Sequence, residues 1–210
     1  MVSKTKNRGS IPLDPANYYG YIMEKNIIFF TGKARSGKNY VSCCLKKELE
    51  QQGYKVCELA FADLLKEYIC TVFDLDLDEL NRLKNDNAVF TENGLTMREI
   101  LQRFGTELFR NRIDRDYWIK VLAKRITKSN YDYYLVTDLR FPNELHAVTY
   151  CANYDTTGCA YHYRVVKILC ATNEQVGSQH LSENSFDEIH ADVAIDNTGH
   201  KYKFNIKDFF

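Results

Sequence analysis

A glycine-framed loop after an apolar strand is the part of this sequence best suited to chemistry. The strand, residues 27–31, is followed by Gly32-Lys33-Ala34-Arg35-Ser36-Gly37-Lys38. Because glycine lacks a Cβ, the backbone at Gly32 and Gly37 is free to turn its N–H groups inward, and a helix that begins near Gly37 directs the positive end of its dipole at the same point. This arrangement binds phosphate, and Lys38 would reach the β- and γ-phosphates of a nucleoside triphosphate.

The residues that follow the loop depart from the usual pattern. A serine or threonine normally follows the lysine and gives a hydroxyl group to Mg²⁺, whereas this chain has Asn39 and then Tyr40. We expect residues 32–40 to bind ATP, with the amide of Asn39 as a ligand for Mg²⁺. A plain strand-to-helix turn is the alternative.

A carboxylate and an arginine follow a second apolar strand, residues 133–138. Asp138 ends this strand, where an enzyme with a phosphate loop places a carboxylate to hold Mg²⁺ directly or through water, although aspartate is also common in turns. Arg140 would neutralise charge on transferring phosphoryl oxygens, or would pair at the surface with Glu144.

Other polar residues are candidates for the site of a phosphate acceptor. Asp63 and Lys66 follow a strand at 55–60 and would line the acceptor pocket, although Asp63 is equally suited to cap a helix. Arg98 and Gln102 lie four residues apart on one helix face, where they would present a guanidinium group to a phosphate and an amide to a base.

The rest of that helix and its successor favour structural interpretations first. Thr96 and Glu99 form a capping box, and Glu99, Arg103 and Glu107 are most simply a solvated ladder of ion pairs. Trp118, the only tryptophan, is expected in the core, with stacking on a base as the alternative. A histidine, His180, is interpreted as a surface or lid residue.

Strands and helices alternate along the chain. We expect strands at 27–31, 55–60, 133–138, 162–169 and 192–196, and helices at about 37–52, 62–73, 96–111, 115–129 and 142–151. Residues 74–95 are acidic and then polar, which predicts a short helix and an exposed loop. The alternation predicts an α/β fold with a mostly parallel sheet covered by helices on both faces, and ligands at the carboxyl ends of the strands. Residues 1–24 are expected to be a flexible leader and residues 25–210 a single domain.

The composition limits the possible partners and compartments. Lys plus Arg equals Asp plus Glu at 28 each, so no global charge attracts nucleic acid or membrane. The seven cysteines include no C-x-x-C pair, and no apolar run approaches 18 residues. We therefore expect a soluble cytoplasmic protein with reduced thiols, no zinc, no nucleic-acid or membrane partner, and small-molecule substrates.

Taken together, the motifs resemble those of one family. They are the phosphate loop, Phe61-Ala62-Asp63-Leu64-Leu65-Lys66, Arg98-Glu99-Ile100-Leu101-Gln102-Arg103-Phe104-Gly105-Thr106-Glu107, Asp116-Tyr117-Trp118, Asp138-Leu139-Arg140-Phe141-Pro142-Asn143-Glu144 and His180-Leu181-Ser182-Glu183. In this order, over roughly residues 26–200, the chain resembles bacteriophage deoxynucleoside monophosphate kinases.

The resemblance implies an adenylate-kinase-like P-loop fold, with three layers, that moves the γ-phosphate of ATP onto several dNMPs for viral DNA precursors in the host cytoplasm. It also implies that Arg98, Trp118, Asp138, Arg140 and Glu144 take part in substrate binding and catalysis. The family usually has Asp-Thr after the loop lysine and an acidic residue where this chain has Gln102.

Three further possibilities stay open at this point. Animal-type phosphomevalonate kinases share a Ser-Gly-Lys loop and a strand ending in Asp-x-Arg, although the Phe-Pro-Asn-Glu run favours the phage kinases. The changed residues Asn39 and Tyr40 also allow a nucleotide-binding protein without turnover. The oligomeric state is open, with a homodimer as one possibility.

Overall fold

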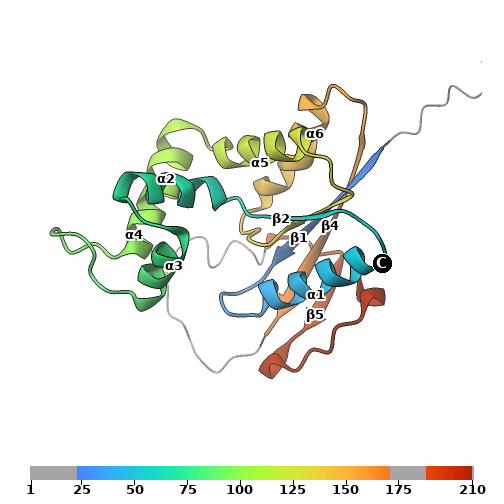
Figure 1. The fold of residues 1–210 in the computed structure, drawn as a ribbon, viewed down its shortest axis with the longest axis horizontal. Helices are drawn as coiled ribbons and strands as arrows, with labels where there is room; N and C mark the ends of the chain where they lie inside the picture. Colours follow the sequence, from blue (N-terminus) through green and yellow to red (C-terminus); the bar gives the residue numbers. More distant parts are fainter. Residues whose placement is uncertain (1–22, 171–187, 210) are drawn as a thin grey trace, which may run out of the picture.

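The computed structural model describes residues 23–170 and 188–209 (Figure 1). Of the expected leader, only residues 23 and 24 fall within this range, and Glu24 already belongs to the first strand. His180 and its neighbours lie outside the described residues. No helix in the described part of the chain is both long enough and apolar enough to cross a membrane.

A five-stranded parallel sheet forms the centre of the molecule. Its strands are β1 (Glu24–Thr31), β2 (Val56–Leu59), β3 (Tyr133–Val136), β4 (Ala160–Leu169) and β5 (Val193–Asp196). They lie in the order β2-β3-β1-β4-β5, and all four neighbouring pairs are parallel. The predicted strands are confirmed, and since they are parallel their carboxyl ends meet at one edge of the sheet.

The helices follow the prediction with two local differences. They are α1 (Lys38–Gln51), α2 (Asp63–Phe73), α3 (Leu77–Asp86), α4 (Met97–Gln102), α5 (Tyr117–Lys128) and α6 (Ala147–Tyr154). The helix expected at 96–111 continues beyond α4 as a π-helix, Arg103–Ile113, and α6 is preceded by a 3₁₀ turn, Pro142–His146. Pro142 has no backbone N–H, which is tolerated at the first position of a helical turn because an N–H there would have no partner within the turn. π-Helical turns often mark functional sites.

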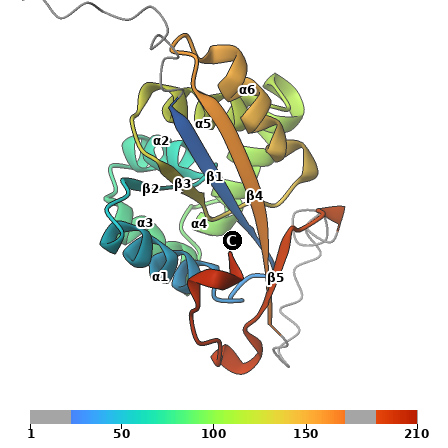
Figure 2. The same cartoon turned by 90° about the vertical axis from the view of Figure 1, so that its right-hand side faces the viewer.

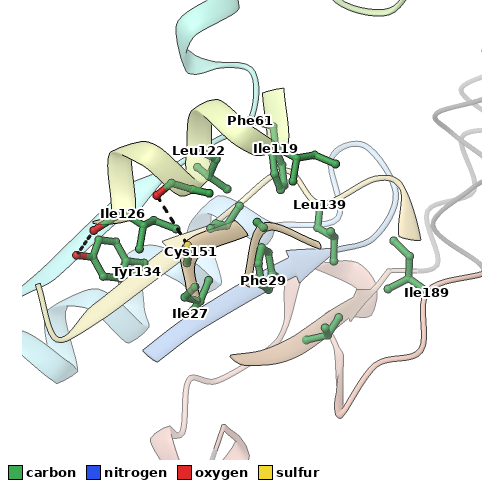
Figure 3. Packing of buried hydrophobic residues seen from close by; sticks show 14 residues of the cluster. Ile27, Phe29, Phe61, Ile119, Leu122, Ile126, Tyr134, Leu139, Cys151 and Ile189 are labelled. Carbon is green, nitrogen blue, oxygen red and sulfur yellow. Dashed lines mark hydrogen bonds between the residues drawn. The ribbon is translucent and has the colours of Figure 1, made fainter. Parts of the chain in front are cut away.

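Alternating residues of β1 pack on opposite faces of the sheet, which gives the three-layer α/β/α arrangement. Ile27 and Phe29 lie in a cluster with residues of β3, α5 and α6 (Figure 3). Ile28 and Phe30 lie in a second cluster, with residues of α1 and with Phe209. Both faces of a parallel sheet are buried in this class of fold, which is why the central residues of β1, Ile27 to Phe30, are all apolar.

A third cluster lies outside these two layers and joins α2, α3 and α4. Its buried members are Leu65, Ile69, Leu80, Met97 and Ile100. Figure 1 shows the three helices gathered beyond the edge of the sheet where β1 runs into the loop before α1. Trp118 of α5 packs against this third cluster and also against the cluster that contains Ile27 and Phe29, so it links the two.

A buried lysine, Lys25, caps the C-terminal end of α5. The ammonium group of Lys25 donates to the carbonyl oxygens of Ile126 and Ser129, at 3.3 and 2.8 Å, and lies 5.9 Å from the ring centres of Tyr134 and Tyr161. Lys25 is only 4% exposed. The last carbonyls of a helix have no partners within the helix and carry partial negative charge, so this cation stabilises them. Figure 2, turned by 90°, shows β1 and β4 running side by side.

Candidate functional site

The loop between β1 and α1 has a backbone that depends on glycine. Gly32 has a φ of +137°, and a Cβ placed there would lie 2.4 Å from the carbonyl oxygen of Ile168 in β4. Gly37 has a φ of +93° and stands directly before the first residue of α1. Arg35, between them, is also in the left-handed region, with a φ of +60°. These conformations turn the loop sharply above the end of β1, as the sequence predicts.

The start of α1 is open to an anion. No side chain caps the helix, and its first turn contains no acidic residue. Lys38 donates from its ammonium group to the carbonyl oxygens of Gly32 and Lys33, at 2.8 and 2.7 Å, so its charge lies against the loop. Asn39 and Tyr40, in the same turn, are exposed. The positive end of the helix and the lysine therefore lie at one place.

A residue that the sequence analysis missed fixes this loop from the far end of the chain. Asn197 directly follows β5 and is 2% exposed. Its side-chain amide donates to the carbonyl oxygen of Ser36 at 2.8 Å and accepts from the backbone N–H of Tyr202 at 3.2 Å. In the sequence, only its position directly after a strand could have indicated a role in the site. The contact itself could not be predicted, because it joins residues 161 positions apart.

Asp138 lies beside the end of β1. The N–H of the next residue, Leu139, donates to the carbonyl oxygen of Phe30 at 3.2 Å. The Asp138 carboxylate accepts from the N–H groups of Phe61 and Ala62, at 2.8 and 3.1 Å, so it also joins the end of β3 to the start of α2. Each carboxylate oxygen keeps a second lone pair, which leaves Asp138 able to contact a cation.

Asp63 lies close to Asp138. It is the first residue of α2, and its carboxylate accepts from the N–H of Ala60 at 2.7 Å. Burial raises the pKa of Asp63, and the charge of Asp138 raises it further, whereas the hydrogen bond from Ala60 and the charges of Lys66 and Arg125 lower it. The structure thus brings two carboxylates from neighbouring strand ends together.

Glu144 is buried and has protein partners at both oxygens. Its Oε2 accepts from the N–H groups of Arg140 and Phe141, at 2.7 and 3.0 Å, and its Oε1 lies 3.6 Å from Nη1 of Arg110. The alternative of a surface ion pair between Arg140 and Glu144 is therefore wrong, because Glu144 is inside the protein and pairs with Arg110. Burial raises the pKa of Glu144 to about 7, with a contribution from Asp138, and the N–H donors and Arg110 oppose the rise.

Arg110 organises the segment that carries these residues. Its Nη2 donates to Oδ1 of Asn143 at 2.6 Å, and its guanidinium carbon lies 3.5 Å from the ring centre of Phe141. Asn143 in turn donates to Asp116, which also accepts from the hydroxyl of Tyr150. Arg110 was missed in the sequence because its partners come from another part of the chain. The network fixes the backbone from which Arg140 extends.

Four cations from four elements gather next to these carboxylates. They are Lys66 of α2, Lys84 of α3, Arg98 of α4 and Arg140 after β3. Lys84 is half-buried, and burial lowers its pKa to about 8, with the positive charges of the other three adding to this effect and Asp138 opposing it. Lys66, Arg98 and Arg140 were predicted site residues, whereas Lys84 was missed because residues 74–95 were interpreted as a surface segment.

Trp118 and Gln102 are the two residues predicted to lie near the base of the acceptor. The indole N–H of Trp118 donates to the carbonyl oxygen of Gly105 at 2.9 Å, and its ring lies 5.0 and 4.9 Å from the rings of Phe109 and Tyr117. These contacts support the packing interpretation of Trp118. Gln102, the last residue of α4, is half-buried. Glu99 is engaged in the predicted capping box with Thr96, which is confirmed.

The described residues contain no group of three or more His, Cys, Asp or Glu side chains that could hold a metal ion. Mg²⁺ takes one or two protein carboxylates together with waters and phosphate oxygens, and the Asp138 carboxylate at the end of β3 is a ligand of that kind.

The comparison with known sequences gives a consistent result. A sequence model of the family described as deoxynucleotide monophosphate kinase matches residues 67–206. A deoxynucleotide monophosphate kinase from Enterobacteria phage T4 is 39% identical over 59 residues, covering 27% of this chain and 24% of the relative. One from Escherichia phage RB69 is 28% identical over 107 residues, covering 50% and 39%. A deoxynucleoside-5′-monophosphate kinase from Escherichia phage T5 is 33% identical over 82 residues, covering 37% and 32%. The matched part spans at most 39% of the length of these relatives.

Solved structures of APS kinase CysC from Mycobacterium tuberculosis are also similar. A mutant of that enzyme has a TM-score of 0.39 and 14% identity, covering 82% of this chain and 86% of the other. The complex with AMPPNP and APS has a TM-score of 0.37 and 15% identity, covering 70% and 64%. At such low identities and TM-scores, we draw no conclusion from this similarity.

Proposed function

This chain belongs to the deoxynucleotide monophosphate kinase family, and on that premise we propose that it transfers the γ-phosphate of ATP to deoxynucleoside monophosphates, giving the diphosphates. One observation carries the proposal: a phosphate loop and a separate group of cations lie at the same edge of the sheet. Two ligands that each carry phosphate need two such places, and a kinase must hold both ligands with their phosphates close together.

The donor would bind at the loop. The backbone of residues 32–37 and the first turn of α1 would surround the phosphates of ATP, and Lys38 would contact the β- and γ-phosphates. Asn197 supports this role, because it fixes the carbonyl of Ser36 and so limits movement of the loop. Tyr40, exposed in the first turn of α1, would lie beside the nucleotide.

Asn39 and Asp138 would hold Mg²⁺. When bound, the ion neutralises charge on the β- and γ-phosphate oxygens. We expect Asn39→Thr and Asn39→Asp to lower the Mg²⁺ concentration that gives half-maximal activity, because both restore an oxygen ligand of the usual kind. An unchanged Mg²⁺ titration in both variants would show that position 39 does not contact the metal.

The acceptor would bind between α2, α3, α4 and the segment after β3. Arg98 and Arg140 would neutralise charge on the acceptor phosphate and on the transferring group, with Lys66 and Asp63 at the border. Glu144 would act by positioning, since its contacts hold the backbone of Arg140. Gln102 and Trp118 would lie near the base. The acceptor phosphate is already an anion, so the reaction depends on positioning and charge neutralisation rather than on a general base.

The test is ADP release from ATP and Mg²⁺ with each dNMP, each NMP and phosphomevalonate, with an acceptor-free control. We expect turnover with one or more dNMPs. Lys38→Ala should abolish it without loss of the fold, whereas Lys47→Ala, at an exposed position on the same helix, should retain it. Turnover with phosphomevalonate alone would identify a small-molecule kinase, and ATP binding without turnover on any acceptor would identify a nucleotide-binding protein.

A further inference from the structure

The four cations of the site form no ion pair with an acidic side chain of the described residues. Among the described residues, no ion pair or hydrogen bond joins the side chain of Lys66, Lys84, Arg98 or Arg140 to a carboxylate. By contrast, Arg82, two residues before Lys84 on α3, lies 3.5 and 3.6 Å from the carboxylates of Glu79 and Asp86. Glu79 and Asp86 of α3 therefore pair with Arg82 and not with Lys84.

Lys84 is the least expected member of the group. It is half-buried near the end of α3, whereas Arg98 and Arg140 are exposed. Charged groups of three other elements act on it: Lys66 of α2, Arg98 of α4, and Arg140 and Asp138 after β3. The one acidic group among them, Asp138, already accepts two backbone hydrogen bonds.

Keeping Lys84 charged among these cations costs free energy when no ligand is bound. Burying an ammonium group disfavours its charge, and three more cations nearby disfavour it further. An anion with two charges and several acceptor oxygens would reverse both effects, and a phosphate monoester has these properties. The γ-phosphate of the donor has the same chemistry, but the phosphate loop already supplies a site for it at α1.

We propose that Lys84 binds the phosphate of the dNMP acceptor, donating from its ammonium group to a phosphate oxygen together with the other three cations. The inference rests on the proposed function and adds a residue of α3 to the acceptor site. It also gives α3 a part in the reaction, in addition to the packing of Leu80 and the partly buried Leu83 in the third cluster.

The first experiment separates acceptor from donor binding. Lys84→Met keeps the apolar stem and removes the charge, Lys84→Arg keeps the charge, and Arg82→Met is the control on the same helix. We expect Lys84→Met to raise KM for the dNMP by about 10- to 100-fold, the loss of one hydrogen bond to a charged group, and to leave KM for ATP within about 2-fold. Lys84→Arg should recover most of the loss, and Arg82→Met should behave like the wild type.

Either of two results would overturn the inference while leaving the kinase proposal intact. One is an unchanged KM for the dNMP in a folded Lys84→Met variant, with folding checked by circular dichroism and thermal unfolding. The other is a rise confined to KM for ATP, which would assign Lys84 to the donor γ-phosphate.

A binding titration without ATP keeps the inference testable even when no turnover occurs. Calorimetry with dTMP and with thymidine compares the same base with and without the phosphate. The wild type should bind dTMP more tightly, and Lys84→Met should remove most of that difference. No difference between wild type and variant would refute the role of Lys84, whatever the outcome of the kinase assay.

The pH profile gives a readout that a purely structural role would not affect. Because the pKa of Lys84 is lowered to about 8, its charge is lost above that pH in the free enzyme, and kcat/KM for the dNMP should fall there. Bound phosphate raises the pKa, so kcat should stay level over the same range. Lys84→Arg should not show this fall, because arginine stays protonated.

Discussion

Replacing Glu144 by glutamine should make the free energy of unfolding depend less on pH. The wild-type carboxyl has its pKa raised from 4.5 to about 7, chiefly because it is buried, and this difference corresponds to about 3 kcal/mol of unfolding free energy. A raised pKa means that the folded protein binds the proton more tightly than the unfolded chain. The contribution is therefore fully present below pH 4.5 and is lost as the pH rises through 7.

Urea unfolding of wild type and Glu144→Gln at pH 5, 6, 7 and 8 measures this contribution directly. Other titrating groups act on both proteins and cancel in the difference between their unfolding free energies. We expect that difference to change by about 2–3 kcal/mol between pH 5 and pH 8, with the wild type losing stability relative to the variant.

Arg110 supplies an independent check. Its positive charge opposes the rise in the pKa of Glu144, so Arg110→Met should raise that pKa further and extend the loss of stability to higher pH. Stability curves of wild type and Glu144→Gln that stay parallel within about 0.5 kcal/mol from pH 5 to 8 would refute the reasoning, since Glu144 would then not titrate in this range.

Three further substitutions test the packing of the site. Gly32→Ala should lower the free energy of unfolding in urea by more than about 2 kcal/mol and abolish ATP binding in calorimetry, because the new Cβ meets a backbone carbonyl of β4. The control Gly53→Ala, at a φ of +91° with open space around the Cβ, should lower it by about 1 kcal/mol, and equal losses in the two variants would refute the argument. Lys25→Met should lower stability by about 2 kcal/mol, because the carbonyls of Ile126 and Ser129 at the end of α5 lose their charged donor and keep only neutral ones such as the Tyr134 hydroxyl, and an unchanged urea midpoint would contradict this role. Trp118→Phe removes the indole donor to the carbonyl of Gly105 and should cost about 1–2 kcal/mol by circular dichroism in urea, so a stability equal to that of the wild type would show that the bond contributes nothing.

The order of elements and the phosphate loop could be predicted because local sequence determines them. Strand residues 27–30 are apolar on both faces, Gly32 and Gly37 have positive φ, and the capping box of Thr96 and Glu99 needs only four consecutive residues. These features depend on neighbours in the chain, and the structure reproduces them.

The contacts within the site could not be predicted in the same way. Asn197 reaches Ser36 across 161 residues, and Arg110 reaches Asn143 across 33. Lys84 is surrounded by cations only because α2, α3 and α4 fold together. No local pattern distinguishes it from the paired Arg82 two residues earlier. Pairings of this kind depend on tertiary packing, which periodicity does not report.

The separate cluster of α2, α3 and α4 has a consequence for the order in which the molecule opens. The sheet is covered on both faces, whereas these helices share a small core of five buried side chains and gather four cations at the strand ends. Backbone amides of α3 and α4 should therefore exchange with solvent deuterium through a partial unfolding that leaves β1 and β3 protected. A bound phosphate neutralises the repulsion and should slow this exchange, and the single tryptophan, which touches both cores, would report the same opening by fluorescence.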